Sequence, residues 1–192
     1  ANNGIQNPSH TYLAAGIYEV TVQVADANGC SNADTLDVAV YSLPPADTIA
    51  YSPGLKVCKG KQVSLTAPSG MDYTWEWSTG ETTQEIIVDT AGTYTVTVTN
   101  AEGCTMVTGP VTVVLLPLPD ALISGNPVIC DYGCVTLSTP PGLNYLYQWL
   151  DANSNPINQY MESSIVVCSY NLLSPYYVVV KDTLSGCVAN AG

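Results

Sequence analysis

Cysteine is the residue type in this sequence with the clearest chemistry. The chain has seven cysteines, and none of them belongs to a Cys-x-x-Cys pair or to a Cys/His cluster with the spacing of a zinc site. Thiols in such a pattern form disulfide bonds when the protein folds in an oxidising compartment. The cysteines therefore predict a secreted protein that is held together by disulfides and binds no structural metal.

Four cysteines can be paired by their place among the expected strands. Cys58 precedes the strand expected at residues 61–66, and Cys104 follows the strand that carries Tyr94, so we expect a bond between these two cysteines. Such a bond closes a loop of nearly fifty residues and is worth about 4 kcal/mol on the chain-entropy model. The register of the tryptophans then suggests a second bond, because Cys130 stands as far before Trp149 as Cys58 stands before Trp77. By this analogy Cys130 pairs with Cys187.

The remaining cysteines are Cys134, Cys168 and Cys30. We expect Cys134 to pair with Cys168, although the four cysteines after residue 117 allow three different pairings. Cys30 has no partner in this scheme, and we expect it to bond a residue outside the chain.

Catalytic combinations of side chains are hard to build from this sequence. His10 is the only histidine, so a Ser-His-Asp or Cys-His arrangement would depend on it alone, and a structural role is favoured. Glu81 and Glu85 could form the carboxylate pair of a glycoside hydrolase, but they lie in a polar turn and the strand after it. We therefore expect no enzymatic activity.

The net charge excludes one class of partner. Sixteen Asp and Glu against four Lys and no Arg give −12, whereas phosphate recognition needs a basic face. Asp47 and Asp120 follow prolines at expected junctions and are weak candidates for a calcium site. Solvated acidity that keeps the protein soluble is the favoured interpretation, so we expect no cofactor. No apolar run reaches the length that spans a bilayer, and we expect no membrane insertion of this segment.

The elements that must position these residues are strands. Apolar and polar residues alternate from Tyr18 to Val24, from Tyr94 to Val98 and from Tyr73 to Trp77, which predicts half-buried strands. Clusters of Gly, Pro, Asn and Asp separate them at short intervals, and helical periodicity is absent. We expect an all-β chain of β-sandwiches, each with a Trp against a disulfide and a tyrosine corner after a Gly turn.

The chain also repeats itself. A Tyr-containing strand that ends in Gly-Cys occurs at residues 16–30, 92–104 and 175–187, and the Leu-Pro segments at 43–47 and 116–120 recur at nearly the interval between the first two Gly-Cys ends. Prolines favour extended linkers, so these segments mark boundaries. The predicted modules are the following: 1–43, the C-terminal part of a module; 44–116, a complete module; and 117–192, a module with an extra disulfide that lacks its last strand. We therefore expect the chain to be part of a longer array.

Several motifs resemble a known group. The segments His10-Thr11-Tyr12, Gly16-Ile17-Tyr18 and Asp26-Ala27-Asn28-Gly29-Cys30 resemble the second half of a PKD-type domain. The middle module, from Trp77-Ser78-Thr79-Gly80 onward, resembles the PKD-like and Ig-like repeats of large Bacteroidota surface proteins, including gliding-motility adhesins. The resemblance implies tandem Ig-like/PKD-like β-sandwiches, secreted and associated with the outer membrane, whose first partners are other modules of the same chain.

A second resemblance concerns modification. Four Asp-Thr-apolar tripeptides resemble the O-glycosylation acceptor of secreted Bacteroidota proteins, which implies modification at Thr35, Thr48, Thr90 and Thr183. Asp-Thr pairs are also frequent at turns and strand ends, which is the structural alternative.

The tyrosines suggest a contact surface. The chain has thirteen Tyr and no Phe, and a tyrosine ring suits half-exposed contacts with sugars or proteins. Tyr160, Tyr170 and Tyr176 lie in the extra length of the last module and are candidates for such contacts.

Three functions remain open. The leading one is a non-catalytic segment of a long extracellular adhesin or stalk that spaces or presents a binding region. The second is a segment of a structural filament whose copies assemble through strands or modules. The third is a ligand-binding appendage of a secreted enzyme, with surface glycans or proteins as partners.

Overall fold

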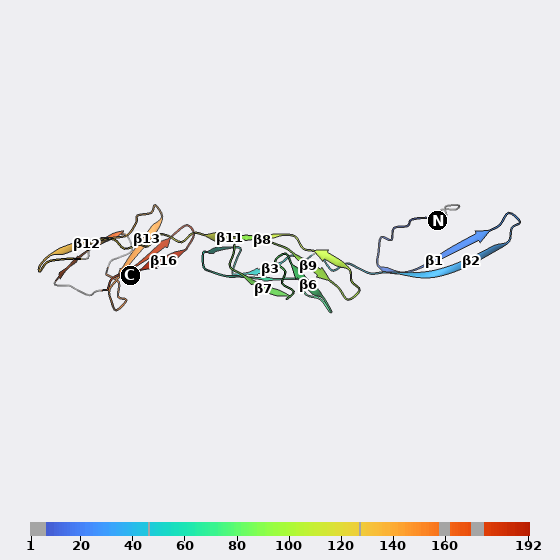
Figure 1. The fold of residues 1–192 in the computed structure, drawn as a ribbon, viewed down its shortest axis with the longest axis horizontal. Helices are drawn as coiled ribbons and strands as arrows, with labels where there is room; N and C mark the ends of the chain where they lie inside the picture. Colours follow the sequence, from blue (N-terminus) through green and yellow to red (C-terminus); the bar gives the residue numbers. More distant parts are fainter. Residues whose placement is uncertain (1–6, 46, 127, 158–161, 170–174) are drawn as a thin grey trace. The chain divides into compact units, whose positions relative to one another are not determined.

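The computed structural model describes residues 7–45, 47–126, 128–157, 162–169 and 175–192. Sixteen β-strands with assigned bounds lie within these residues, as the alternating sequence predicts (Figure 1). In this part of the chain, no helix is long and apolar enough to cross a membrane. The chain forms two compact units: unit 1 contains residues 1–50, 65–86 and 94–111, and unit 2 contains 51–64, 87–93 and 112–192.

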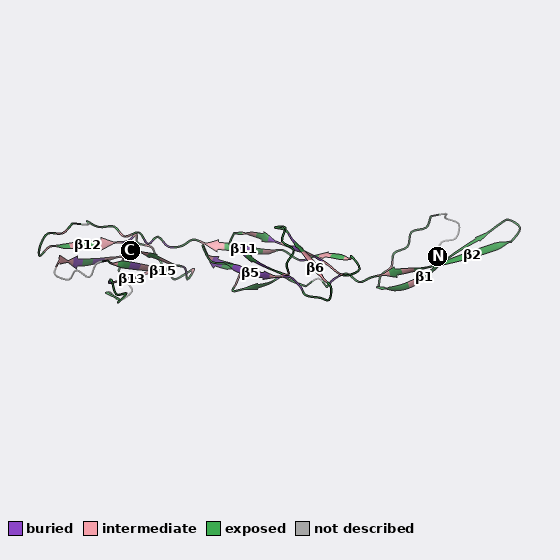
Figure 2. Ribbon diagram, turned by 60° about the horizontal axis from the view of Figure 1, so that its bottom comes forward, coloured by how far each residue is buried: buried purple, intermediate pink, exposed green. Residues whose placement is uncertain are grey.

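Unit 1 begins with a long hairpin. Strands β1 (Gly16–Ala25) and β2 (Ser31–Val40) pair antiparallel over ten residues and form a two-stranded sheet of their own. The apolar residues of β1 alternate as expected, but Val22 is 59% exposed and Val24 63% (Figure 2). The expectation that this strand is half-buried is therefore wrong, because no second sheet of the described residues covers the hairpin.

A three-stranded sheet also lies in unit 1. Its strands are β6 (Thr74–Trp77), β9 (Val96–Thr99) and β10 (Thr105–Val107), in the order β10-β9-β6 and all antiparallel. Trp77 lies opposite Val96 and is 2% exposed. The alternate residues of these strands point inward, as a period of two requires.

Three short strands form a sheet whose residues are divided between the units. They are β3 (Ala50–Ser52), β5 (Val63–Thr66) and β7 (Glu85–Val88), in the order β3-β5-β7. Val63 and Leu65 in β5 are fully buried, whereas Ile86 and Ile87, neighbours in β7, are 5% and 65% exposed. One face of this sheet therefore belongs to a core and the other faces solvent.

Unit 2 contains three further sheets. The first is β4 (Lys56–Cys58), β11 (Val111–Leu116) and β8 (Gly92–Tyr94), in the order β4-β11-β8, with β4 and β11 parallel. The second is the antiparallel pair β12 (Cys134–Ser138) and β14 (Ser164–Cys168). The third is β13 (Tyr145–Leu150), β15 (Tyr177–Asp182) and β16 (Val188–Ala191), in the order β13-β15-β16 and antiparallel.

The core of unit 2 lies between its second and third sheets. Ile165 and Val167 of β14 belong to the same buried cluster as Trp149 of β13 and Val178 and Val180 of β15. Each strand contributes every second residue, and the last three of these side chains are fully buried. Two sheets that share one apolar core form a β-sandwich, which confirms the predicted fold class.

Candidate functional site

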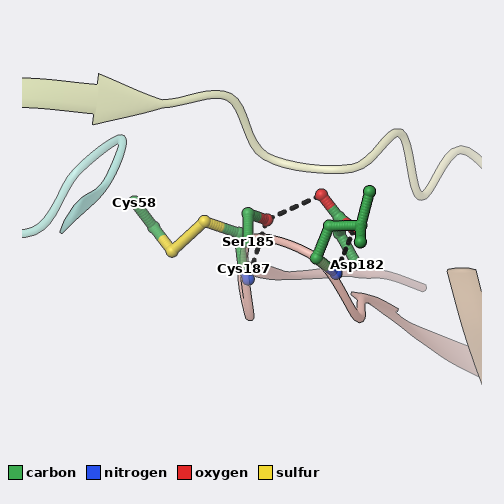
Figure 3. Close-up of a disulfide and its surroundings, with 5 residues drawn as sticks. Cys58, Asp182, Ser185 and Cys187 are labelled. Atoms are coloured by element: carbon green, nitrogen blue, oxygen red, sulfur yellow. Dashed lines mark hydrogen bonds between the residues drawn. A yellow bond between two sulfur atoms is a disulfide. The ribbon is translucent and has the colours of Figure 1, made fainter. Parts of the chain in front are cut away.

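The turn between β15 and β16 carries the cysteine of a disulfide (Figure 3). The N–H of Asp182 donates to the carbonyl of Cys187 at 2.9 Å, and the N–H of Gly186 donates to the carbonyl of Asp182 at 2.8 Å. Gly186 has φ +75°, in the left-handed region that favours glycine. The turn therefore closes at Asp182 and fixes the position of Cys187 immediately before β16.

A side-chain relay completes this turn. The Cys187 N–H donates to Ser185 Oγ at 3.2 Å, and the Ser185 hydroxyl donates to Asp182 Oδ2 at 2.7 Å. Asp182 Oδ1 accepts the N–H of Leu184 at 2.9 Å. The hydrogen bond from Ser185, followed by that from Leu184, holds the pKa of Asp182 below its ordinary value. The turn is therefore organised around a charged carboxylate.

The sulfur of Cys187 bonds to Cys58, with the two Cα atoms 5.6 Å apart and a sequence separation of 129. Cys187 is fully buried, and both cysteines belong to unit 2. Cys58 ends β4, and its carbonyl accepts the N–H of Lys61 at 2.9 Å in a turn where Gly60 has φ +86°. Each half of the disulfide thus sits in its own tight turn.

This bond corrects two of the expected pairings. Cys58 is bonded to Cys187 and not to Cys104, and Cys130 is unpaired within the described structure. Cys58 lies opposite Leu116 of β11 in unit 2, whereas Cys104 follows β9 in unit 1. The spacing of the cysteines identified equivalent positions along the chain but not which of them face each other. The expected Cys58–Cys104 disulfide beside the core tryptophan is therefore not formed.

The third expected pair is present. Cys134 and Cys168 are bonded, with their Cα atoms 4.0 Å apart, because they lie directly opposite each other at one end of the β12–β14 pair. Cys30 is exposed and has no disulfide partner among the described residues, as Cys104 and Cys130 have none.

The turns at Cys30 and Cys104 resemble the turn at Cys187 but are one residue shorter. In both, the first residue, Asp26 or Asn100, donates its N–H to the cysteine carbonyl, at 2.9 Å and 3.1 Å respectively. Its side-chain oxygen accepts the cysteine N–H, at 2.9 Å for Cys30 and 2.8 Å for Cys104. The glycine before each cysteine has a positive φ, +87° and +82°. The role of Asp26 and Asn100 in these turns was not predicted from the sequence, although an Asp or Asn shortly before each Gly-Cys was a readable signal.

Cys130 resembles the other half of the disulfide. Its carbonyl accepts the N–H of Gly133 at 2.8 Å, as the carbonyl of Cys58 accepts the N–H of the residue three positions later. The third residue of this turn, Tyr132, has φ +59°, and the third residue of the Cys58 turn, Gly60, also has a positive φ. The equal spacing of Cys58 and Cys130 to their tryptophans therefore reflects a shared local structure.

Aromatic residues near the start of the chain have structural roles. The rings of His10 and Tyr12 meet edge to face with centroids 4.7 Å apart, and the ring of Tyr12 lies 4.5 Å from that of Tyr18. The hydroxyl of Tyr18 donates to the carbonyl of Ala14 at 2.9 Å, which is the tyrosine-corner arrangement that the Gly-x-Tyr pattern predicts.

The carboxylate candidates are exposed side chains. Glu81 and Glu85 are both exposed. Asp47 and Asp120 are exposed and belong to different units, and Asp120 Oδ1 accepts the N–H of Leu122 at 3.2 Å. Within the described ranges, no group of three or more His, Cys, Asp or Glu could hold a metal ion. The geometry therefore gives no support to the calcium candidates.

A hollow of about 480 Å³ lies on unit 1, lined by Tyr73, Thr74, Trp75, Glu76, Thr82 and Thr99. Its titratable lining residues are Glu76 and Tyr73, and it contains a single carboxylate rather than the pair that glycoside hydrolysis uses.

The predicted modification and contact residues have mixed surroundings. The four threonines Thr35, Thr48, Thr90 and Thr183 are all exposed. The hydroxyl of Thr183 donates to the carbonyl of Asn144 at 2.9 Å. Tyr160 and Tyr170 lie outside the described residues. Tyr176 is partly buried and packs against the core of unit 2, so it has a structural role.

Comparison with known proteins gives one family match. A family model described as the PKD domain matches residues 1–40, which supports a PKD-type module at this end of the chain. No curated protein matches the sequence.

Three solved structures are similar to the chain. SGBP-B of the Bacteroides ovatus mixed-linkage glucan utilization locus, solved with a mixed-linkage heptasaccharide, is 16% identical over 92% of this chain and 49% of its own, with a TM-score of 0.25. The FN1–FN3 domains of chicken CNTN1 are 13% identical over 90% and 71%, with a TM-score of 0.31. A cytokine receptor complex is 15% identical over 71% and 92%, with a TM-score of 0.27. The chain spans about half the length of the Bacteroides ovatus protein.

Proposed function

We propose that this chain is a non-catalytic segment of a long extracellular cell-surface adhesin or stalk, in which β-sandwich repeats space or present a binding region. One observation carries the proposal: a cysteine-bearing turn, closed by an Asp or Asn and with a positive-φ glycine before the cysteine, is built three times, at residues 26–30, 100–104 and 182–187. Recurrence of one structural unit along a chain is the property of an array whose units act together. The proposed repeats are the modules expected from the sequence: residues 1–43, 44–116 and 117–192.

Composition and bonding support an extracellular location. Two disulfides hold unit 2, and disulfides persist in oxidising compartments. The charge of −12 disfavours nucleic acid and favours solubility at the cell surface.

Surface labelling tests this proposal. Antibodies raised against the 192-residue chain should label intact producing cells, and brief protease treatment of those cells should remove the signal. A cytoplasmic protein of the same cells is the control and should be labelled only after permeabilisation. Labelling of the chain only after permeabilisation would contradict the proposal.

We also propose O-glycosylation at one or more of Thr35, Thr48, Thr90 and Thr183. None of these four side chains is buried, so a glycosyltransferase could reach them in the folded protein. Peptide mass spectrometry of protein from the producing cells should show sugar mass increments on these threonines. Unmodified masses at all four positions would remove this part of the proposal.

A further inference from the structure

Three cysteines have no disulfide partner among the described residues: Cys30, Cys104 and Cys130. Each of them occupies one of the two local structures that the Cys58–Cys187 disulfide joins. Cys30 and Cys104 follow a positive-φ glycine in a turn closed by an Asp or Asn, as Cys187 does. Cys130 opens a turn with a positive φ at its third residue, as Cys58 does.

The structure therefore contains one complete cross-link, Cys58–Cys187, and three unpaired cysteines whose turns resemble one or the other end of it. In the complete one, the Cys58-type turn belongs to residues 44–116 and the Cys187-type turn to residues 117–192. The bond thus runs from a sequence repeat to the repeat after it, and not within a repeat.

We infer that the three unpaired cysteines form this same cross-link with neighbouring repeats of a longer polypeptide. Cys30 and Cys104 each bond the cysteine of a Cys58-type turn in the repeat before their own. Cys130 bonds the cysteine of a Cys187-type turn in the repeat after its own. The inference rests on the array of repeats that is part of the proposed function. Two covalent connections then join each pair of neighbouring repeats: the backbone and a disulfide.

The spacing of the turns agrees with this register. The interval from Cys58 to Cys130 is nearly the same as the interval from Cys30 to Cys104. A Cys58-type turn in the repeat that contains Cys30 would therefore lie before residue 1. The partner of Cys104 would be the cysteine of that turn.

The surroundings of the thiols permit the reaction. Cys30 and Cys130 are exposed and Cys104 is partly exposed, so an oxidant can reach all three. Two thiols lose two protons and two electrons when they form a disulfide. A disulfide-bearing oxidant, such as a thiol–disulfide oxidoreductase, accepts them by exchange and leaves as a dithiol.

Disulfide mapping of the full-length polypeptide from producing cells tests the inference. The protein is denatured and alkylated without reductant, digested, and analysed for linked peptides by mass spectrometry. We expect a Cys58–Cys187 link, links from Cys30 and Cys104 to cysteines of Cys58-type turns, and a link from Cys130 to a Gly-Cys turn. Alkylated Cys104 or Cys130, a Cys58–Cys104 link or a Cys130–Cys187 link would overturn it.

A matched pair of variants separates the cross-link from misfolding. In the full-length polypeptide, Cys130→Ser should release a single new thiol in a Gly-Cys turn, whereas the control Cys134→Ser should release Cys168 in the same repeat. Release of no new thiol by Cys130→Ser would overturn the inference. Failure of the disulfide map would leave the surface location untouched, because antibody labelling tests that separately.

Discussion

At the scale of single residues, the first side chain of each cysteine-bearing turn holds the backbone of the cysteine, directly or through one other side chain. Asp26 and Asn100 accept the N–H of their cysteine directly. The turn at Asp182 is one residue longer, and Ser185 relays the contact between the carboxylate and the cysteine N–H. A short polar side chain that bonds the backbone ahead of it is a frequent device in turns.

Replacing Ser185 tests this relay. Ser185→Ala removes the hydroxyl that joins Asp182 to the N–H of Cys187, and we expect unit 2 to lose about 1 kcal/mol of unfolding free energy. Urea denaturation followed by tryptophan fluorescence measures the loss. The control is Leu184→Ala in the same turn, which should change stability by less than about 0.5 kcal/mol because Leu184 is 80% exposed. Equal losses in the two variants would show that the relay contributes nothing.

Asp151 makes the stability of unit 2 depend on pH. Its Oδ1 accepts the N–H groups of Asn155 and Asn153 at 2.8 Å each, and its Oδ2 accepts the Asn155 side-chain amide at 3.2 Å. The backbone hydrogen bond from Asn155 is the largest cause that holds the pKa of Asp151 below its ordinary 3.8, against the opposing effect of burial.

The direction of the pH effect follows from this lowered pKa. The ionised carboxylate stabilises the fold fully above pH 3.8, and this stabilisation is lost as the pH falls through the lower pKa of the folded state. We therefore expect Asp151→Asn to be less stable than the original chain at pH 6, with a difference that shrinks below pH 3.8. Urea midpoints from pH 2 to pH 6 measure this, and a difference that stays constant over the range would refute it.

At the scale of strands, alternation predicts burial only where a second sheet is present. In β7, Ile86 is 5% exposed and Ile87 is 65% exposed, although the two residues are chemically identical neighbours. We expect Ile86→Ala to cost about 2–5 kcal/mol through lost burial and the cavity left behind. Ile87→Ala is the matched control and should cost less than about 1 kcal/mol. Thermal or urea unfolding compares the two, and similar losses would mean that β7 does not present one face to a core.

The β1–β2 hairpin shows why the same pattern can mislead. Val20, Val22 and Val24 alternate with polar residues as clearly as the buried residues of β9 do, but they are 42%, 59% and 63% exposed. Alternation records which side chains share a face, and that much was predictable from the sequence. Whether another sheet covers this face depends on residues elsewhere in the chain, so the strands could be predicted and the burial could not.

At the candidate site, too, local structure could be predicted from the sequence whereas long-range disulfide pairing could not. Local features of the sequence predicted the Gly-Cys turns and the tyrosine corner at Tyr18, whereas the pairing of Cys134 with Cys168 was expected only because these two cysteines remained. Cys134 and Cys168 end strands that are neighbours in one sheet, so their pairing follows from strand order. The bond from Cys58 to Cys187 has a sequence separation of 129, and a spacing analogy has no information about which turns meet over such a distance.

At the scale of the whole molecule, that bond changes how the sequence repeats are connected. The proposed repeats at 44–116 and 117–192 are joined by the backbone at Leu116-Pro117 and again by Cys58–Cys187. A cross-link over a separation of 129 restricts the unfolded chain and is worth about 5 kcal/mol on the chain-entropy model. A disulfide within each repeat would stabilise that repeat alone and would leave the junction dependent on a few linker residues.

Cutting the backbone at this junction distinguishes the two arrangements. A protease recognition sequence is inserted between Leu118 and Pro119 of the chain, free thiols are alkylated, and the protein is cut. Because Cys58 and Cys187 lie on opposite sides of the cut, we expect one band near the intact 20.2 kDa on a non-reducing gel and two bands after reduction. Cys58→Ser should give two bands without reductant, whereas Cys134→Ser, which removes a disulfide on one side of the cut, should still give one. Two bands from the original chain without reductant would support Cys58–Cys104 and Cys130–Cys187 instead, and would leave the junction with its backbone as the sole covalent connection.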